Sequence, residues 1–216
     1  MPDLIALPGV IYGPSISFDP IRTRSTSRML GRRTETMLRG TPYWVATYAA
    51  SKLTTDEVSL FDAFNMLASD GGVFAGYDPH RPRPIAYAGA PLAGVKAGGG
   101  AFNGDAVLQA ITNPKTIVVN GLPAGFTLSV GDYVEVRKSP LVRSLHRITA
   151  PATANGVGVV TLSIRFALDT QTFAAGNTVH FEKSACIMEM DEGSFSLPKS
   201  WPVSNVQFTA TELFFS

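Results

Sequence analysis

The residue types that most often carry catalysis or bind metals are few in this chain and lie far apart. Two of its three histidines, His146 and His180, lie in strand-like segments, and His80 lies among prolines and arginines. None stands in a recognised catalytic or metal-binding motif such as G-x-S-x-G or H-E-x-x-H. Cys186 is the single cysteine, so neither an internal disulfide nor a cysteine metal cluster can form. We therefore expect the histidines to be surface or interface residues.

Two other patterns resemble chemical motifs but lack a required feature. The run Gly98, Gly99 and Gly100 has neither the Gly-Lys-Ser/Thr ending of a phosphate-binding loop nor dinucleotide-binding spacing, so it predicts a loop. Asp191 and Glu192 are adjacent, and neighbouring residues of a strand point to opposite faces, so the two carboxylates are not expected to act as a pair. The sequence predicts no catalytic residue, no cofactor and no metal site, and we expect no enzyme activity.

Arginine is concentrated between positions 22 and 39, where only Glu35 opposes it. The cluster consists of Arg22, Arg24, Arg28, Arg32, Arg33 and Arg39. Arginine makes planar, paired contacts with carboxylates and phosphates, so these residues could form a contact face, or they could be a solvated strand face. Net charge is +1, from 18 basic and 17 acidic residues. Since phosphate binding scales with basic residues, this balance favours protein carboxylates over DNA as the partner.

The composition is that of a folded, charge-poor protein. Of 216 residues, 45% are hydrophobic and 16% are charged, against about 25% charged in a typical soluble domain. Either partners cover part of the surface, or the chain is a Gly- and Pro-rich β protein with a Ser/Thr surface. The N-terminus lacks the features of a signal peptide, and no stretch reaches the ~18 apolar residues of a membrane span. The default compartment is the cytoplasm, and no membrane insertion is expected.

Strand-like patterns dominate, and they are interrupted by one helix. Thr54 and Glu57 form a capping box, and Asp70-Gly71-Gly72 stops the helix, which is predicted over 55–69. Its predicted buried stripe is Leu60, Phe61, Phe64, Leu67 and Ala68. Strand patterns surround it over 15–50 and 73–77, so the helix must pack on a sheet. We expect Trp44 in mid-strand to lie in the core.

The rest of the sequence predicts two domains, one of them discontinuous. Residues 78–84, with three prolines, form an extended edge loop, and the Gly-rich stretch 93–105 is predicted to be a linker. Short strands separated by turn signals over 106–185 predict a small β-barrel or sandwich. The last strand, over 203–216, presents Val206, Phe208, Ala210, Glu212 and Phe214 and needs a sheet to pack on. We expect it to join a β-sandwich built from 1–92 and 186–216.

The order of these features resembles the distal tail and minor tail proteins of long-tailed bacteriophages. The shared elements are a basic strand region with Gly31-Arg32-Arg33, a strand with Trp44, the helix start Leu53-Thr54-Thr55-Asp56-Glu57, Phe61 and Phe64, Gly72-Val73-Phe74 before Asp78-Pro79, the barrel motif Leu128-Ser129-Val130-Gly131-Asp132, and the final Glu212-Leu213-Phe214. The resemblance implies a tail-tube-like β-sandwich with one packed helix and an inserted small β-barrel.

The same resemblance implies a structural role in the virion, in a phage tail assembled in the host bacterial cytoplasm. The chain would form a ring, of six copies by family analogy, that joins the tail tube protein to the tail-tip hub and to receptor-binding or fibre proteins. DNA would only pass through the lumen. Candidate subunit or partner contacts are Arg22, Arg24, Arg28, Arg32, Arg33, Tyr77, His80, Arg81 and Arg83. Arginine is enriched at interfaces, and a prolyl loop loses little entropy on binding.

Three alternatives remain open. A carbohydrate- or cell-surface-binding module would need exposed aromatic residues, for which only Trp44 and Trp201 are candidates. A tail-associated hydrolase would need a catalytic constellation, and the sequence offers none. A tail tube, terminator or neck protein would share the same sandwich-plus-helix plan.

Overall fold

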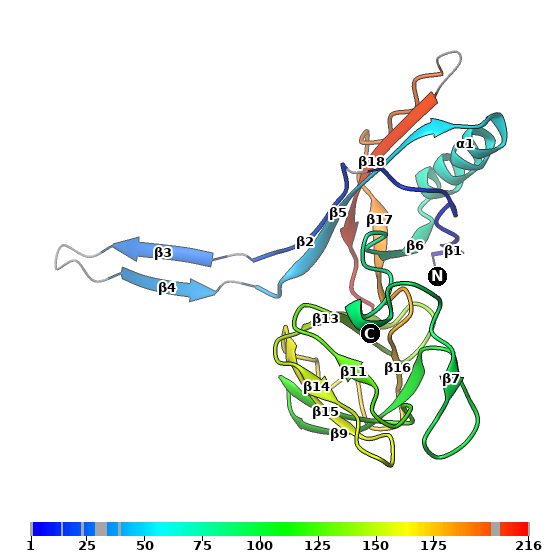
Figure 1. Cartoon of the computed structure of the whole chain (residues 1–216). Helices are drawn as coiled ribbons and strands as arrows, with labels where there is room; N and C mark the ends of the chain where they lie inside the picture. The colour runs from blue at the N-terminus through cyan, green and yellow to red at the C-terminus, as the bar shows by residue number, and fades with distance from the viewer. Residues whose placement is uncertain are drawn as a thin grey trace. The chain divides into compact units, whose positions relative to one another are not determined.

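The chain folds into two compact units, which are described separately (Figure 1). The computed structural model describes residues 2–13, 15–22, 24–28, 34–38, 40–199 and 204–215. Unit 1 comprises residues 1–74 and 188–213, and unit 2 comprises residues 75–187 and 214–216. The described residues contain many strands, one α-helix and one closed barrel, so the predicted mainly β fold with one helix and a small barrel is confirmed.

Six strands form one sheet in the order β1-β6-β17-β18-β5-β2. Their bounds are Leu4–Ile5 (β1), Ser17–Ile21 (β2), Tyr43–Leu53 (β5), Val73–Tyr77 (β6), Ala185–Met190 (β17) and Ser204–Glu212 (β18). The chain passes between the units within β6 and β17. A sandwich would have two such sheets. Outside the barrel unit, the described strands all join this one sheet, apart from the short hairpin considered below.

The C-terminal strand β18 occupies an interior position in this sheet. It pairs with β17 on one side and, along most of its length, with β5 on the other. Val206, Phe208, Ala210 and Glu212 are buried, as expected for a strand that completes a sheet. Residues 204–212 thus form a strand between β17 and β5. Phe214 differs from the expectation, because it follows the end of β18 and is exposed.

An aromatic cluster forms the core of unit 1. Every second residue of β5 from Trp44 to Ala50 is buried, as the period of a strand requires, and Tyr48 is among them. The ring of Tyr48 stacks on Phe208 with centroids 5.2 Å apart. Phe64 lies 5.4 Å from both Phe208 and Phe74. The prediction that Trp44 belongs to the core is confirmed.

Helix α1 (Thr55–Ser69) has the predicted bounds and the predicted cap. The backbone N–H of Thr54 donates to Glu57 Oε2 at 2.8 Å, and the N–H of Glu57 donates to Thr54 Oγ1 at 3.4 Å. The N–H and the hydroxyl of Thr54 both donate to Glu57 Oε2, and these two bonds lower the pKa of Glu57. The helix ends where Gly71 adopts φ of +85°, which side chains disfavour. The cap chemistry visible in the sequence therefore fixes both ends.

The predicted buried stripe of α1 is wrong at two positions. Phe61, Phe64 and Ala68 are buried against the sheet, but Leu60 and Leu67 are more than half exposed. Phe61, Phe64 and Ala68 lie within about 60° of one another around the helix axis, and Leu60 and Leu67 lie beyond one edge of that arc. The sheet contacts Phe61 and Phe64, and the two leucines stay exposed to solvent.

A closed six-stranded barrel is the centre of unit 2, in the order β10-β15-β13-β12-β16-β9. The strands are Asp105–Asn113 (β9), Thr116–Asn120 (β10), Tyr133–Arg137 (β12), Arg143–Ile148 (β13), Val160–Arg165 (β15) and Thr178–His180 (β16). Around it lie a 3-10 turn and two strand pairs: η1 (Ile85–Tyr87), β7 (Gly94–Val95) with β8 (Ala101–Phe102), and β11 (Thr127–Leu128) with β14 (Ala152–Thr153). Closure leaves the barrel no free sheet edge.

The Gly-rich stretch 93–105 differs from the linker that its composition predicts. It forms the β7–β8 hairpin, and Phe102 is buried in the barrel core together with Leu92. The preceding loop is also bonded to the barrel, since the backbone N–H of Ile85 donates to Asp132 and that of Leu92 to Glu182. These contacts explain why unit 2 begins after Phe74 and not near residue 92.

Candidate functional site

A hairpin of two exposed strands, β3 (Arg24–Arg28) and β4 (Thr34–Leu38), carries the basic cluster found in the sequence. It connects β2 to β5 within unit 1, and Figure 1 shows it directed away from α1. Among the described strands β3 and β4 pair only with each other. Every residue of 24–28 and 34–37 is exposed. A two-stranded hairpin without a buried face is marginally stable at best in water, so a partner surface would stabilise this one.

The cross-strand register places two of the predicted contact residues on one face of the hairpin. Arg24 lies opposite Leu38 and Arg28 opposite Thr34, while Ser25 and Ser27 alternate with them on the other face. Arg24 and Arg28 make no ion pair with any described residue. Arg22 is also exposed, directly after β2. Arg32, Arg33 and Arg39 lie outside the described residues, as does Trp201.

Arg81 and Arg83, by contrast, bind within unit 2. Arg83 donates to Glu182 through Nε at 3.0 Å and Nη2 at 2.5 Å, and both side chains are largely buried. Burial acts to raise the pKa of Glu182, but hydrogen bonds from Arg83 and from the N–H of Leu92 outweigh it, so the pKa is lowered. Arg83 therefore anchors the 78–84 loop to the barrel, and its planar donor face is already occupied.

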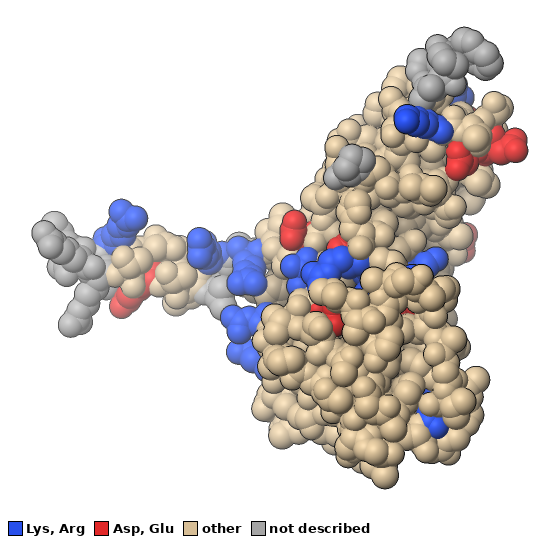
Figure 2. Space-filling model, viewed as in Figure 1, with Lys and Arg blue, Asp and Glu red and all other residues tan. Residues whose placement is uncertain are grey.

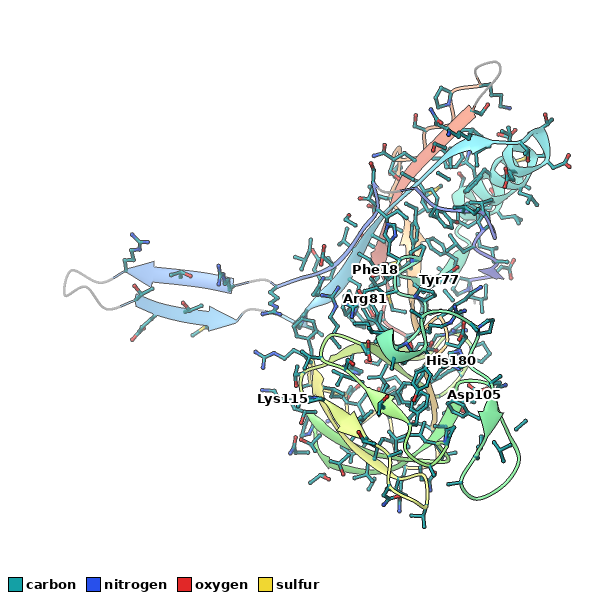
Figure 3. All side chains as sticks on the ribbon, viewed as in Figure 1. Phe18, Tyr77, Arg81, Asp105, Lys115 and His180 are labelled. Carbon is teal, nitrogen blue, oxygen red and sulfur yellow. The ribbon has the colours of Figure 1, made fainter. Side chains whose placement is uncertain are left out.

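Arg81 lies against the turn that carries the predicted L-x-x-G-D motif. Its Nη2 is 3.7 Å from Asp132 Oδ1, and its guanidinium lies 5.8 Å from the ring centre of Tyr133 (Arg81 is labelled in Figure 3). Gly131 has φ of +87°, and a Cβ there would lie 3.3 Å from Arg81 Nη2. The buried carboxylate of Asp132 also accepts from the N–H of Ser129 at 2.7 Å. The glycine and aspartate of the motif thus hold the loop against the barrel.

Tyr133 connects the loop to two barrel strands. Its hydroxyl donates to Asp78 Oδ2 at 3.1 Å and accepts from Arg147 Nη2 at 2.6 Å. Burial, and then the charge of Asp78, raise its pKa above the ordinary value of a tyrosine. A phenol that stays protonated keeps both hydrogen bonds at all physiological pH values. This arrangement is a structural network and not an acid–base site.

The other two predicted contact residues of this loop region lie at different positions in unit 2. His80 is exposed, and its backbone N–H donates to Asp78 Oδ1 at 3.0 Å in a local turn. The Nζ of Lys183 lies 5.5 Å from the ring centre of Tyr77, and burial raises the pKa of Tyr77. The structure therefore leaves His80 accessible to a partner and engages Tyr77 within the unit.

Two histidine pairs were missed by the sequence analysis. His180 Nδ1 lies 2.5 Å from Asp105 Oδ1, at directly opposed positions of β16 and β9 (both residues are labelled in Figure 3). His146 Nε2 lies 2.9 Å from Ser144 Oγ, and its Nδ1 lies 3.1 Å from the carbonyl oxygen of Phe166. Because a carbonyl only accepts, Nδ1 carries the proton and Nε2 accepts from the serine.

Ser144 and His146 are hydrogen-bonded as a nucleophile and its general base would be, but the pKa of His146 is too low for that role. Burial lowers the pKa of His146 to about 4. A general base works best with a pKa near the operating pH, so this imidazole would be a poor acceptor of the serine proton near pH 7. The hydrogen bonds are better explained as the pairing that a buried imidazole requires.

Glu135, a buried glutamate on β12, also has a structural role. Glu135 accepts from Arg137 at 2.7 Å and Arg143 at 3.2 Å through Oε1, and from the N–H of Ala185 at 2.9 Å through Oε2. Burial lowers the pKa of Arg143, and the charge of Glu135 acts in the opposite direction. All of the carboxylate's partners belong to unit 2, where it ties the start of β17 to the barrel.

Unit 2 also has an uncharged groove of about 460 Å³ beside η1. Tyr87 stacks flat on Phe126 with centroids 4.5 Å apart, and its hydroxyl accepts from the N–H of Thr127 at 3.0 Å. Pro91 and Pro123 form further parts of the wall. Such a surface suits a neutral ligand with apolar faces.

Across the residues that the structure describes, no group of three or more His, Cys, Asp or Glu side chains is placed to hold a metal ion. Within the same residues no helix is long and apolar enough to cross a membrane. No protein-family model matches the sequence, and no curated protein matches it either.

Proposed function

We propose that this protein is a structural component of a bacteriophage tail. It forms a ring at the distal end of the tail, of six copies by analogy with the family it resembles, and joins the tail tube to the tip hub and the host-recognition proteins. It is assembled in the host cytoplasm and acts in the virion. A tube, terminator or neck position in the same tail is the nearest alternative.

The exposed β3–β4 hairpin is the observation that carries this proposal. Nine exposed residues in two paired strands have no hydrophobic layer of their own among the described residues. The extended hairpin adds little stability to a free monomer, whereas in an assembly it can contact a neighbouring copy. The low charge content of the chain supports the same conclusion, because interface surfaces are depleted in charge at their centres.

The polar residues of the barrel support a structural role as well. Asp132, Glu135 and Glu182 each bind groups of their own unit, and the pKa of His146 is far below the range useful for a base. Each of these groups thus stabilises the fold of its own unit.

Ring formation is tested directly with the purified protein. Light scattering after gel filtration should give the mass of about six chains, and negative-stain electron microscopy should show closed rings. Replacing Arg24 and Arg28 by alanine should leave folded monomers, while the matched pair Lys115→Ala and Lys138→Ala, exposed cations of unit 2, should leave rings unchanged. A wild-type protein that stays monomeric at every concentration contradicts the proposal.

One observation favours a second candidate, the carbohydrate-binding module. The uncharged groove with Tyr87 against Phe126 offers aromatic and apolar walls of the kind that stack on sugar rings. A glycan array with wild type and Tyr87→Ala separates the two functions. Binding that the substitution abolishes, from a protein that forms no ring, would favour the sugar-binding function.

A further inference from the structure

The outer side of α1 presents an apolar strip that its own unit leaves uncovered. Leu60, Met66 and Leu67 are 55%, 71% and 54% exposed, and Ala63 between them is exposed too. Their spacing of three, six and seven residues places them on one side of a helix. We call these four residues the α1 outer face. Four neighbouring apolar residues on the solvent side of one helix are typical of a binding surface.

Acidic residues lie at both ends of this face. Asp56 is in the first turn and Asp70 caps the last, and α1 contains no lysine or arginine. Two other carboxylates are already bound, since Glu57 closes the capping box and Asp62 accepts from Lys199 Nζ at 2.8 Å. Figure 2 shows acidic side chains over α1 and basic side chains along the hairpin. The face therefore fits an occupant with long apolar stems and positive ends.

The arginine face of the hairpin has this composition. Arg24 and Arg28 lie on one side of β3, four residues and so about 13 Å apart. Thr26, between them, and Thr34 and Thr36 on β4 share that side and offer only small side chains. Arginine stems cover apolar surface while the guanidinium groups reach carboxylates, which are the two features that the α1 outer face requires.

We infer that the β3–β4 hairpin of one copy docks on the α1 outer face of the next copy. The inference rests on the proposed function, because it specifies how the ring would close. The stems of Arg24 and Arg28 lie over Leu60 and Leu67, and the guanidinium groups pair with Asp56 and Asp70. These two carboxylates are about 21 Å apart along the helix, a span that two extended arginine side chains can reach from 13 Å apart.

The same chain cannot make this contact with itself. The hairpin joins the sheet at Tyr43, the first residue of β5, whereas α1 follows Leu53, the last residue of β5, about 33 Å away. Figure 1 shows the hairpin extending further from α1. Two different patches of one chain that can meet only between copies give a head-to-tail contact. Such contacts produce closed rings when the rotation between copies closes.

The test uses two full-length variants, each damaged on one side of the interface. The hairpin variant carries Arg24→Glu and Arg28→Glu, and the helix variant carries Leu60→Glu and Leu67→Glu. All four positions are exposed, so circular dichroism and melting temperature should match wild type. Light scattering should find single chains for each variant alone. Mixed one to one, the intact hairpin of the helix variant meets the intact helix of the hairpin variant, and the mass should double without rings.

Matched controls and two outcomes make the test decisive. Lys115→Glu with Lys138→Glu reverses two exposed cations elsewhere, and Val130→Glu with Val157→Glu replaces two exposed apolar residues of the barrel unit. Both control proteins should assemble as wild type does. A helix variant that still forms rings overturns the inference and leaves the proposed function intact, since the hairpin would then dock elsewhere. A wild type that never assembles overturns both.

Cross-linking locates the contact independently. Cys186 is buried, so cysteines introduced at Thr26 of one copy and Ala63 of another would be the accessible thiols. Mixing Thr26→Cys with Ala63→Cys protein should give a disulfide-linked pair, and mixing Thr26→Cys with Gln207→Cys protein, a position exposed on β18, should give none. Equal cross-linking in both mixtures would overturn the assignment of this contact.

Discussion

Buried polar residues in unit 2 hold segments that are distant in the sequence. Asp132 binds the turn at Ser129 and the loop at Ile85, and Glu135 binds the start of β17. A buried carboxylate is tolerated only when its oxygens are hydrogen-bonded, and both residues meet this condition. Buried charge in this protein therefore specifies which loop lies against which strand.

His146 gives a pH dependence that can be measured. Its pKa of about 4 in the folded state lies below the 6.5 of an exposed histidine. The unfolded chain therefore binds more protons between these values, and stability falls as the pH falls from about 6.5 to 4. We expect urea unfolding of wild type to lose about 2 kcal/mol more between pH 7 and pH 5 than unfolding of His146→Gln.

Other groups titrate in this range too, so the difference between the two proteins is the informative quantity. His180→Gln provides the comparison, because that histidine is only partly buried and faces Asp105. Equal losses of stability in wild type and His146→Gln would mean that His146 is not the buried neutral group described here.

Helix α1 depends on its packing against the sheet for stability. α1 is 15 residues long, near the length at which an isolated helix is marginal in water, so it depends on packing. Phe61 and Phe64 supply that packing by contacting Phe208 of β18. The helix thus links the segment after β5 to a strand that lies far along the chain.

Truncating Phe64 should therefore weaken unit 1 strongly. Phe64→Ala removes a buried ring that contacts Phe74 and Phe208, and we expect a cost of about 3–5 kcal/mol in the free energy of unfolding. Asp62→Ala removes only an exposed ion pair with Lys199 and should cost no more than about 1 kcal/mol. Similar small losses in urea titrations of both variants would argue that the helix is not docked on the sheet.

The features of helices and strands that could be predicted from the sequence depend mostly on residues that are close together in the chain. The bounds of α1 follow from Thr54, Glu57 and Gly71, which act within a few residues of one another. The Asp105–His180 pair could not be predicted, because the two residues are 75 positions apart and meet only through the barrel register. The bonding of Arg83 to Glu182 has the same origin, and it turns a residue expected at a partner contact into a loop anchor.

At the scale of the whole molecule, the two units differ in how they are built from the chain. Unit 2 is almost continuous, and its barrel closes on itself. Unit 1 is assembled from two distant segments, and it needs β18 between β17 and β5. From turn signals and hydrophobic alternation the sequence predicts a discontinuous part over 1–92 and 186–216 and a second part over 106–185, whereas the two units change over within β6 and β17.

The barrel unit should fold by itself. A fragment of residues 75–187 contains every barrel strand and all partners of Glu135, so it should unfold cooperatively in urea. A second fragment ending at Lys183 lacks β17 and β18 and should retain only the barrel transition. A non-cooperative first fragment, or a second fragment as stable throughout as the full chain, would contradict this division.

The interior position of β18 has a consequence for how the protein is made. Ribosomes complete about 5–20 residues each second, so β18 leaves the ribosome roughly one to six seconds after the last barrel strand, β16. During that interval β18 cannot yet pair with β5. The N–H and C=O groups on that edge of β5 are therefore unpaired and can bond to other nascent chains. The barrel can be folded before the sheet of unit 1 is complete, and contact between copies at that stage would join incomplete sheets. Because β18 completes the sheet that supports both the hairpin and α1, contacts between correctly folded copies can form only after β18 has left the ribosome.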